Sequence, residues 1–301
     1  MTLLLLSLAT FFVAYLINTT MISVFYHRGL AHRAVHWSPR VERFTQIFGI
    51  WLTGLDPKGW VCMHRMHHAF SDTERDPHSP QNLGLFRMVI KQLHAYERIL
   101  RSLTREDITF TRHVRDLPFD ISWVNRRGLW LLPYVAQVAA AGLIGLALAV
   151  LSGVDLTVGS VVLGGAYFAG IMSHPLQGWM VNSLGHAVGP RNFDTPDDSR
   201  NNALAAWLIM GEGLQNNHHQ YPSSARFSYR PHEPDGGWRI IGALQAVGVL
   251  QVNERTLIPA FGAAPLPEET DQPHAADHES RVPTHHSERV PKDDGFRTRA
   301  A

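Results

Sequence analysis

The sequence predicts an all-α membrane protein in which three spanning helices carry a helical cap. The prediction starts from the distribution of charge, because residues 1–27 contain no Asp, Glu, Lys or Arg. Between positions 128 and 190 the only such residue is Asp155. The other parts of the chain are charged and rich in histidine, so long apolar stretches alternate with polar ones.

Three segments are long and apolar enough to cross roughly 30 Å of hydrocarbon as helices. They are residues 3–26, 129–151 and 156–181, and the last two form a hairpin that turns between Ser152 and Asp155. The first segment lacks a basic start and a small-residue cleavage site, which favours a span over a secretory signal.

The remaining residues up to 263 are predicted to form the cap, which comprises 27–127 and 186–263. Within it, Phe44–Leu55 is apolar but short, which indicates an interfacial or re-entrant helix. Leu83–Leu103 is expected to form an amphipathic helix, and Ile240–Leu250 is a candidate for another. Residues 1–263 therefore read as one domain. Residues 264–301 are rich in Pro, Glu, Asp, Ser and His, and we expect a disordered tail there.

The side of the membrane on which the cap lies follows from its basic residues. Residues 28–127 carry many Arg and Lys, whereas the hairpin turn carries none. The positive-inside rule then places the cap on the cytoplasmic side.

Composition excludes several kinds of partner and site. The formal net charge is +1 and no basic patch resembles a nucleic-acid surface, so we expect no nucleic-acid partner. Cys62 is the only cysteine, which rules out an intrachain disulfide and a thiolate-held iron–sulfur cluster. A metal bound here must be held mainly by nitrogen and oxygen.

Seven of the 18 histidines fall into three tight clusters, and His186 is a separate eighth member. The clusters are His27 and His32; His64, His67 and His68; and His218 and His219.

The spacing within these clusters suits a helix. His64, His67 and His68 stand at i, i+3 and i+4, and so face one side of a helix. Gln215, His218 and His219 repeat that pattern, and Asn182 precedes His186 by four residues. His27 and His32 are five apart, which fits better where a membrane helix ends and its last turn opens.

Imidazole is a good ligand for iron, copper and zinc. No single cluster completes a coordination shell, whereas all of them together could fill two metal sites. Two neighbouring irons with open positions can split O2 into an oxidant that takes hydrogen from an unactivated methylene. Such chemistry at a membrane edge suggests oxidation of a lipid chain.

The other histidines are expected to be surface or core residues: His36, His94, His113, His174 and His232. His78, in the segment DPHSP, is expected to have a loop or supporting role rather than to bind a metal directly.

The histidine motifs resemble those of the membrane fatty acid desaturases, a family with three histidine boxes that includes the Δ9 acyl-CoA and acyl-lipid desaturases. HRGLAHR is similar to the first box and HRMHHAFSDTERDPHSP to the second. NSLGH and GEGLQNNHHQYP are similar to the third region. The resemblance runs from about Tyr26 to Tyr221, with the motifs in the right order and spans between them.

The resemblance implies a di-iron centre in a cytoplasmic helical cap and assigns its ligands. These are His27, His32, His64, His67, His68, His186, His218 and His219. Asn182 matches an asparagine that holds an iron through water. Trp60 and Trp179 match tryptophans that line a bent acyl tunnel, whose bend selects the position and cis geometry of the new double bond. Anchoring at the membrane interface is the alternative for both tryptophans.

Three features depart from the family pattern. Gln215 stands where the third box usually begins with histidine; it could ligate iron through its amide oxygen or form a hydrogen bond behind the ligands. Cys62 and Met63 replace an Arg-Asp pair with which animal enzymes grip CoA, which puts acyl-CoA in doubt as the carrier. The family commonly has two spans before the first box, and this sequence has room for one. Either the protein begins outside the membrane, or its start is incomplete.

The function expected from these residues is an oxygen-dependent desaturase that introduces a cis double bond, at Δ9, into a fatty acyl substrate. Its cofactors are two iron ions, with O2 as co-substrate. No His-Pro-Gly-Gly signature of a fused cytochrome b5 occurs, so a separate ferredoxin, rubredoxin or cytochrome b5 is expected to supply electrons. We expect an integral protein of a bacterial inner membrane.

Two alternatives remain open at this point. The first is a related hydroxylase, ketolase or conjugase, because the same irons can return oxygen to the substrate. The second is a metal or haem transporter, although the spans hold few polar candidates, chiefly His174 and Asp155.

Overall fold

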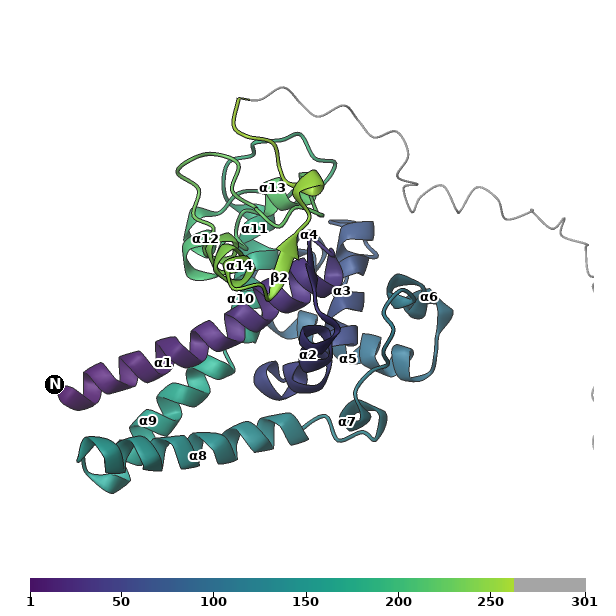
Figure 1. Ribbon diagram of the computed structural model, residues 1–301. Helices are drawn as coiled ribbons and strands as arrows, with labels where there is room; N and C mark the ends of the chain where they lie inside the picture. Colours follow the sequence, from purple (N-terminus) through teal and green to yellow (C-terminus); the bar gives the residue numbers. More distant parts are fainter. Residues whose placement is uncertain (263–301) are drawn as a thin grey trace, which may run out of the picture. The chain divides into compact units, whose positions relative to one another are not determined.

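The computed structural model describes residues 1–262, which are mostly helical (Figure 1). The first half contains α1 (Thr2–Thr20), the π-helix η1 (Met21–Ala31), β1 (Val35–Trp37), α2 (Pro39–Thr53), α3 (Pro57–Phe70), α4 (Pro80–Leu83), α5 (Met88–Thr104), α6 (Ile108–Thr111), η2 (Arg112–Val114) and α7 (Trp123–Arg126). The second half contains α8 (Leu132–Ser152), α9 (Leu156–Ile171), α10 (His174–Trp179), η3 (Met180–Leu184), α11 (Gly185–Ala187), α12 (Ala203–Leu208), α13 (Gln215–Gln220), α14 (Gly236–Ala246), β2 (Leu250–Val252) and η4 (Glu254–Thr256). The predicted tail, 264–301, lies outside the described residues.

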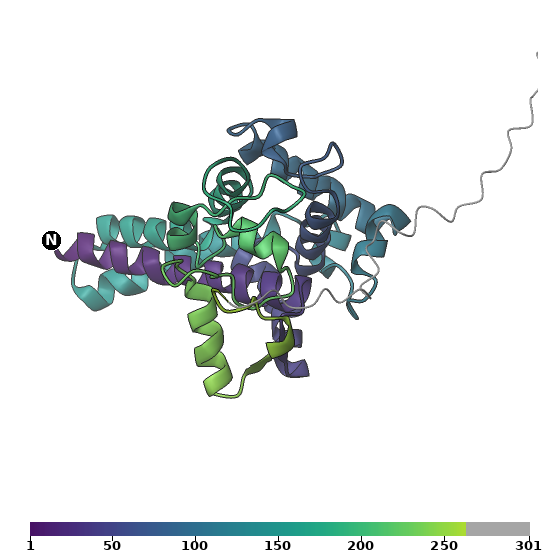
Figure 2. The same ribbon diagram turned by 90° about the horizontal axis from the view of Figure 1, so that it is seen from above.

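Three long apolar helices project together from one side of a helical body, as both views show (Figures 1 and 2). The continuous helical stretches long and apolar enough to span a membrane are Thr2–Ala31, Leu132–Ser152 and Leu156–Ala187. The first and third run past the predicted ends at residues 26 and 181 and enter the body. The predicted class, an all-α membrane protein, is confirmed.

The projecting helices expose large apolar side chains on their outer faces. Leu5 and Phe12 of α1, Leu143 of α8 and Val161 of α9 are examples. Contiguous exposed apolar surface of this extent marks contact with a membrane rather than with water.

Glycines allow these three helices to approach closely. A β carbon at Gly145 of α8 would lie 2.2 Å from the Ser160 carbonyl oxygen, and one at Gly164 of α9 would lie 2.5 Å from the Ala141 carbonyl oxygen. Likewise, a β carbon at Gly170 would lie 2.4 Å from the Phe11 carbonyl oxygen of α1. Backbone contact at small residues is the usual basis of helix association in membranes.

The first span continues into the body as a π-helix. The η1 helix has more residues per turn than an α-helix. The His32 amide donates to the carbonyl of His27, five residues earlier, at 3.1 Å. Residues five apart therefore lie closer to the same side of this helix than they would on an α-helix. The last turn of the membrane helix was expected to open at His27 and His32, and the π-helical turn is this opening.

In the body, α3 begins at an Asp56 N-cap whose side chain accepts from the Lys58 and Gly59 amides, and Pro57 occupies the first turn. The Tyr26 hydroxyl of η1 donates to the Leu55 carbonyl at 2.9 Å, and the Tyr96 hydroxyl of α5 accepts from the Asp56 amide at 2.6 Å. These bonds join the first span, α3 and α5.

The shorter predicted helices are present with shifted ends. The interfacial segment is α2, which begins at Pro39 and packs against α8 and η1. The amphipathic helix predicted at Leu83–Leu103 is α5, and the helix predicted at Ile240–Leu250 is α14. A small antiparallel ribbon was not predicted: β1 pairs with β2, with Val35 opposite Val252 and Trp37 opposite Leu250.

The contact between α8 and α9 yields a prediction. Gly145→Val should destabilise the protein, because its side chain has no room against α9; overpacking of this kind typically costs about 1–3 kcal/mol. Gly142→Val is the matched control, since a β carbon there meets no atom within 4 Å. Thermal unfolding of the purified protein in detergent measures both. Equal melting temperatures for the two variants would contradict this packing.

Candidate metal centre and its cavity

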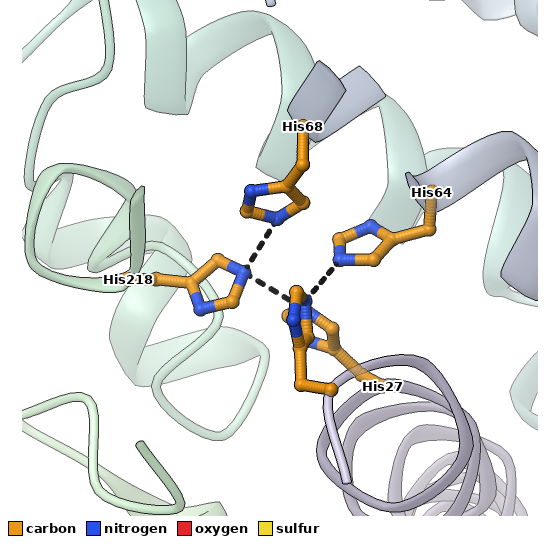
Figure 3. A group of neighbouring side chains, drawn as sticks. His27, His64, His68 and His218 are labelled. Atoms are coloured by element: carbon orange, nitrogen blue, oxygen red, sulfur yellow. Dashed lines mark hydrogen bonds between the residues drawn. The ribbon is translucent and has the colours of Figure 1, made fainter. Parts of the chain in front are cut away.

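Five imidazoles from three distant parts of the chain converge at one point. Their ligand atoms all lie within 4.8 Å of one another. The residues are His27 and His32 of the η1 end, His64 and His68 of α3, and His218 of α13. Figure 3 shows four of them, His27, His64, His68 and His218, with their rings pointing toward one another.

The spacing of the Nε2 atoms in this first group suits a bound ion. His27 and His218 are 3.0 Å apart at these atoms, His68 and His218 2.9 Å, and His32 and His64 2.7 Å. Two nitrogens each about 2.1 Å from one ion and at right angles to each other would be about 3.0 Å apart. The ring positions therefore match adjacent ligands of a single metal ion.

A second group lies beside the first and contains His67, His186 and His219, whose ligand atoms also lie within 4.8 Å of one another. The Nε2 atom of each is buried and has no hydrogen-bond partner among residues 1–262. Three unpartnered nitrogens that converge in a dry interior are costly unless something binds them. The residues present thus fit a second metal ion.

Each imidazole of the second group is held from behind by a carboxylate. The Nδ1 of His67 lies 2.9 Å from Asp76, that of His186 2.8 Å from Asp72, and that of His219 2.5 Å from Asp197. A carboxylate that accepts the Nδ1 proton leaves Nε2 as a free lone pair and fixes the ring, which is the usual arrangement behind metal-binding histidines.

Glu212 has the same role in the first group. Its Oε2 lies 2.5 Å from the His27 Nδ1, and its Oε1 accepts from the Arg28 guanidinium at 3.0 Å and from the Ser23 hydroxyl at 2.5 Å. Arg28 is fully buried, also pairs with Asp235 at 3.0 Å, and stacks over the Phe227 ring. This buried network fixes Glu212 and hence the orientation of His27.

The contacts of these carboxylates with the histidines were not predicted from the sequence. Asp72 and Asp76 lie inside the second motif and Glu212 inside the third. Their closeness in sequence to the histidines could therefore have identified them as candidate supporting residues. Asp197 and Asp235 lie outside the motifs, and no spacing pointed to them.

Burial favours the neutral form of four of the clustered imidazoles. It holds the pKa of His64, His67, His68 and His218 well below the ordinary value, and the neighbouring imidazoles lower these pKa values further. Because only the neutral ring has a lone pair to offer, these four imidazoles remain able to bind metal across the physiological pH range.

The short helix α13 is positioned by its two asparagines. The Asn216 side-chain oxygen accepts from the Asn192 and Phe193 amides at 2.7 and 2.8 Å, and the Asn217 side-chain nitrogen donates to the Phe227 carbonyl at 2.9 Å. Both asparagines are buried. They fix the helix so that His218 points into the first group and His219 into the second.

Gln215 and Asn182 lie near the second group. The side-chain nitrogen of Gln215 donates to the Glu212 carbonyl at 2.6 Å, and its aliphatic part packs so closely on Gly185 that a β carbon there would lie 2.6 Å from Cγ. Asn182, one turn before His186, lines a cavity beside the histidines. Their predicted contacts with iron stay predictions.

His78 lies between α3 and α4, in a loop as expected. It is buried, its ring centroid is 4.5 Å from that of His67, and neither of its nitrogens has a partner among residues 1–262. Together with His67 and Asp76 it forms a further group whose ligand atoms could hold an ion.

The cavity lies against both the first group and the spans. Its walls include His27, His64, Trp60, Leu55 and Ile22, together with residues of α5 and α10. Trp60 stacks on His64, with ring centroids 5.0 Å apart and planes 12° apart. Trp179 is not among the lining residues; its indole nitrogen donates to the Leu85 carbonyl at 2.7 Å.

Fold and site together define a membrane protein whose two histidine groups, which could hold metal ions, adjoin a largely apolar cavity. The family model for fatty acid desaturases matches residues 4–235, and the chain belongs to that family. It is therefore an oxidoreductase that acts on fatty acyl chains.

Three curated relatives show the same likeness. The Delta-9 desaturase-like 4 protein of Arabidopsis thaliana is 30% identical over 243 residues, which cover 79% of this chain and 73% of the relative. The Delta-9 acyl-lipid desaturase 1 of the same plant is 29% identical, with 79% and 72% covered. The sn-1 stearoyl-lipid 9-desaturase of Anabaena variabilis is 31% identical, with 76% of each chain covered.

The carboxylate behind His27 yields a prediction. Glu212→Gln should weaken iron binding about 10–100-fold, because a neutral amide is a weaker acceptor than a carboxylate for the His27 Nδ1 proton and Arg28 loses a charged partner. Extraction of iron by a graded series of chelator concentrations measures the change. Glu97→Gln, on an exposed face of α5, is the control. Iron retention equal to that of the control would contradict this role.

Proposed function

We propose that this protein is an oxygen-dependent acyl desaturase that introduces a cis Δ9 double bond at a histidine-ligated di-iron centre. The observation that supports it most directly is the convergence of two histidine groups beside one cavity. Two irons bound there would supply the oxidising power to remove hydrogen from adjacent methylenes. The protein's own residues hold the irons, place the chain and exclude water.

In this proposal His27, His32, His64, His68 and His218 hold one iron, and His67, His186 and His219 hold the other. Gln215 and Asn182 complete the second site. Trp60 forms the cavity wall next to His64 and positions the acyl chain beside the first iron.

An acyl-lipid is the substrate that the chain fits best. Cys62 is buried, with its thiol donating to the Phe110 carbonyl at 3.4 Å, and Met63 lines the cavity. Neither residue offers a charge to a CoA head group. Two of the relatives are named as lipid desaturases.

The proposal includes a separate electron donor of the ferredoxin, rubredoxin or cytochrome b5 type, and a site that faces the cytoplasm of a bacterial cell. The orientation is supported by the arginines of the cap and their absence from the turn between α8 and α9. A periplasm-dependent reporter inserted at Gly153 would be active only if that turn lies outside.

The function is tested by expression in a host that lacks its own desaturase, followed by gas chromatography and mass spectrometry of the lipids. A product two hydrogens lighter than its precursor, with the double bond at Δ9, is expected. A product one oxygen heavier would favour a hydroxylase instead.

Histidine variants test the centre itself. His64→Ala and His67→Ala should each abolish the unsaturated product and lower the iron content from about two ions per chain to about one, since each removes a ligand from a different group. His94→Ala, on the exposed face of α5, is the control and should keep both product and iron. Unchanged iron in all three variants would refute the ligand assignment.

Gln215 is tested separately, because it replaces an expected histidine. Gln215→Leu should release the iron of the second group at lower chelator concentration and leave that of the first in place, whereas Gln215→His should retain both. Mössbauer spectra of the 57Fe-loaded protein distinguish the two sites. If Gln215→Leu leaves both signals unchanged, Gln215 does not ligate iron.

A further inference from the structure

A polar patch lies in the cavity wall at a distance from both histidine groups. It consists of Gln92 of α5 and of His174 and Gln177, which stand three residues apart on α10. All three side chains line the same cavity as His27 and His64, and all are more than nine-tenths buried. Nearby walls are apolar, with Leu93, Val181 and Ile209 among them.

The hydrogen bonds of the two glutamines use their donors and leave their acceptors free. The Gln92 side-chain nitrogen donates to the Pro175 carbonyl at 2.9 Å, and that of Gln177 donates to the Ser173 hydroxyl at 2.6 Å and to the Asn18 side-chain oxygen at 3.3 Å. Among residues 1–262, the Oε1 atoms of Gln92 and Gln177 accept no hydrogen bond.

The side chain of His174 forms no hydrogen bond with residues 1–262. Neither of its ring nitrogens forms a hydrogen bond within residues 1–262, and Nδ1 is fully buried. An imidazole always has an N–H to donate, so a saturated hydrocarbon chain in the cavity would leave that donor and two amide oxygens unsatisfied. Unmade hydrogen bonds inside a protein are costly. A carbonyl oxygen at this point would accept from the imidazole, and a hydroxyl would in addition donate to one of the amide oxygens.

The position of the patch sets how far that oxygen lies from the reacting carbons. His174 precedes Asn182 by eight residues along the same helical stretch, which corresponds to roughly 12 Å of helix rise. Several methylenes bridge such a distance.

From these observations we infer that His174, with Gln92 and Gln177, binds an oxygen function of the acyl substrate several methylenes from the carbons that are oxidised. The inference rests on the proposed function, because it specifies the substrate of that same cavity. By fixing the chain at one end, the patch determines which methylenes lie beside the metal centre.

The oxygen can come from two sources that share this chemistry. The first is the carbonyl oxygen of the acyl ester, which would accept from His174. The second is a hydroxyl group on the methyl end of the chain, which would accept from His174 and donate to a glutamine oxygen.

Binding to the purified full-length protein in detergent tests the inference without iron or turnover. Three ligands compete against a fluorescent fatty probe: octadecane, methyl stearate and methyl 18-hydroxystearate. If the ester is bound, methyl stearate should bind about tenfold more tightly than octadecane, which corresponds to about 1.4 kcal/mol, and the terminal hydroxyl should add nothing. If a distal hydroxyl is bound, only methyl 18-hydroxystearate should show that gain.

The variant His174→Leu gives the decisive comparison. It should abolish the tenfold preference and leave octadecane binding intact, while His174→Gln, which keeps a donor, should restore most of the preference. Because each ligand partitions into detergent equally in all samples, the ratio between wild type and variant is independent of that partitioning. An identical preference in wild type and His174→Leu would overturn the inference and indicate that only water occupies the patch.

Two controls keep this outcome interpretable. If His174→Leu also loses octadecane binding, its fold is damaged, and Gln177→Met then replaces it in the same comparison. If the desaturase-deficient host yields no unsaturated lipid while the tenfold preference persists, the proposed function fails and the binding patch stands.

Discussion

The site depends on one constraint: imidazole nitrogens must face one another in a dry interior before any ion arrives. The Nε2 atoms of three histidine pairs lie 2.7–3.0 Å apart, so each ring must be oriented from behind if it is to present a lone pair to an ion. Glu212 supplies it for His27, and Asp72, Asp76 and Asp197 supply it for the second group. Each carboxylate accepts the Nδ1 proton and thereby directs Nε2 toward the ion. Two of these bonds, Glu212 with His27 and Asp72 with His186, also connect remote parts of the sequence.

Rigid helices deliver the ligands to that point. The first span enters the body as the π-helix η1, and the third continues through η3 to His186. Short π-helical segments are frequent at functional sites, since they change which residues share a face. Because η1 has more residues per turn than an α-helix, His27 and His32 belong to the same histidine group, with their ring centroids 5.0 Å apart. Membrane anchoring and the positioning of candidate metal ligands are thus properties of the same two helices.

The sequence predicted those parts of the structure that depend on local pattern. The uncharged stretches located the spans, and the i, i+3, i+4 spacing located His64, His67 and His68 on one helical face, as α3 shows. The local sequence pattern could not predict which histidines belong to which of the two groups. His67 and His68 are adjacent in sequence yet belong to different groups, because neighbours on a helix point about 100° apart and the partners come from other elements. The Asp197 and Asp235 contacts likewise arise only from tertiary packing.

Trp60 connects the chemistry of the cap with the shape of the cavity. Its ring stacks on His64, lies edge-on to His27 at 5.8 Å, and packs at 5.9 Å from Tyr26, whose hydroxyl is bonded to the start of α3. The cavity wall is therefore part of the same packed unit as two imidazoles of the first group. An acyl chain that lies against Trp60 is held at a fixed distance from those rings. In the proposed arrangement the polar patch at His174 limits how far the chain can slide along that wall, so separate contacts would set the position along the chain and its proximity to the candidate metal centre.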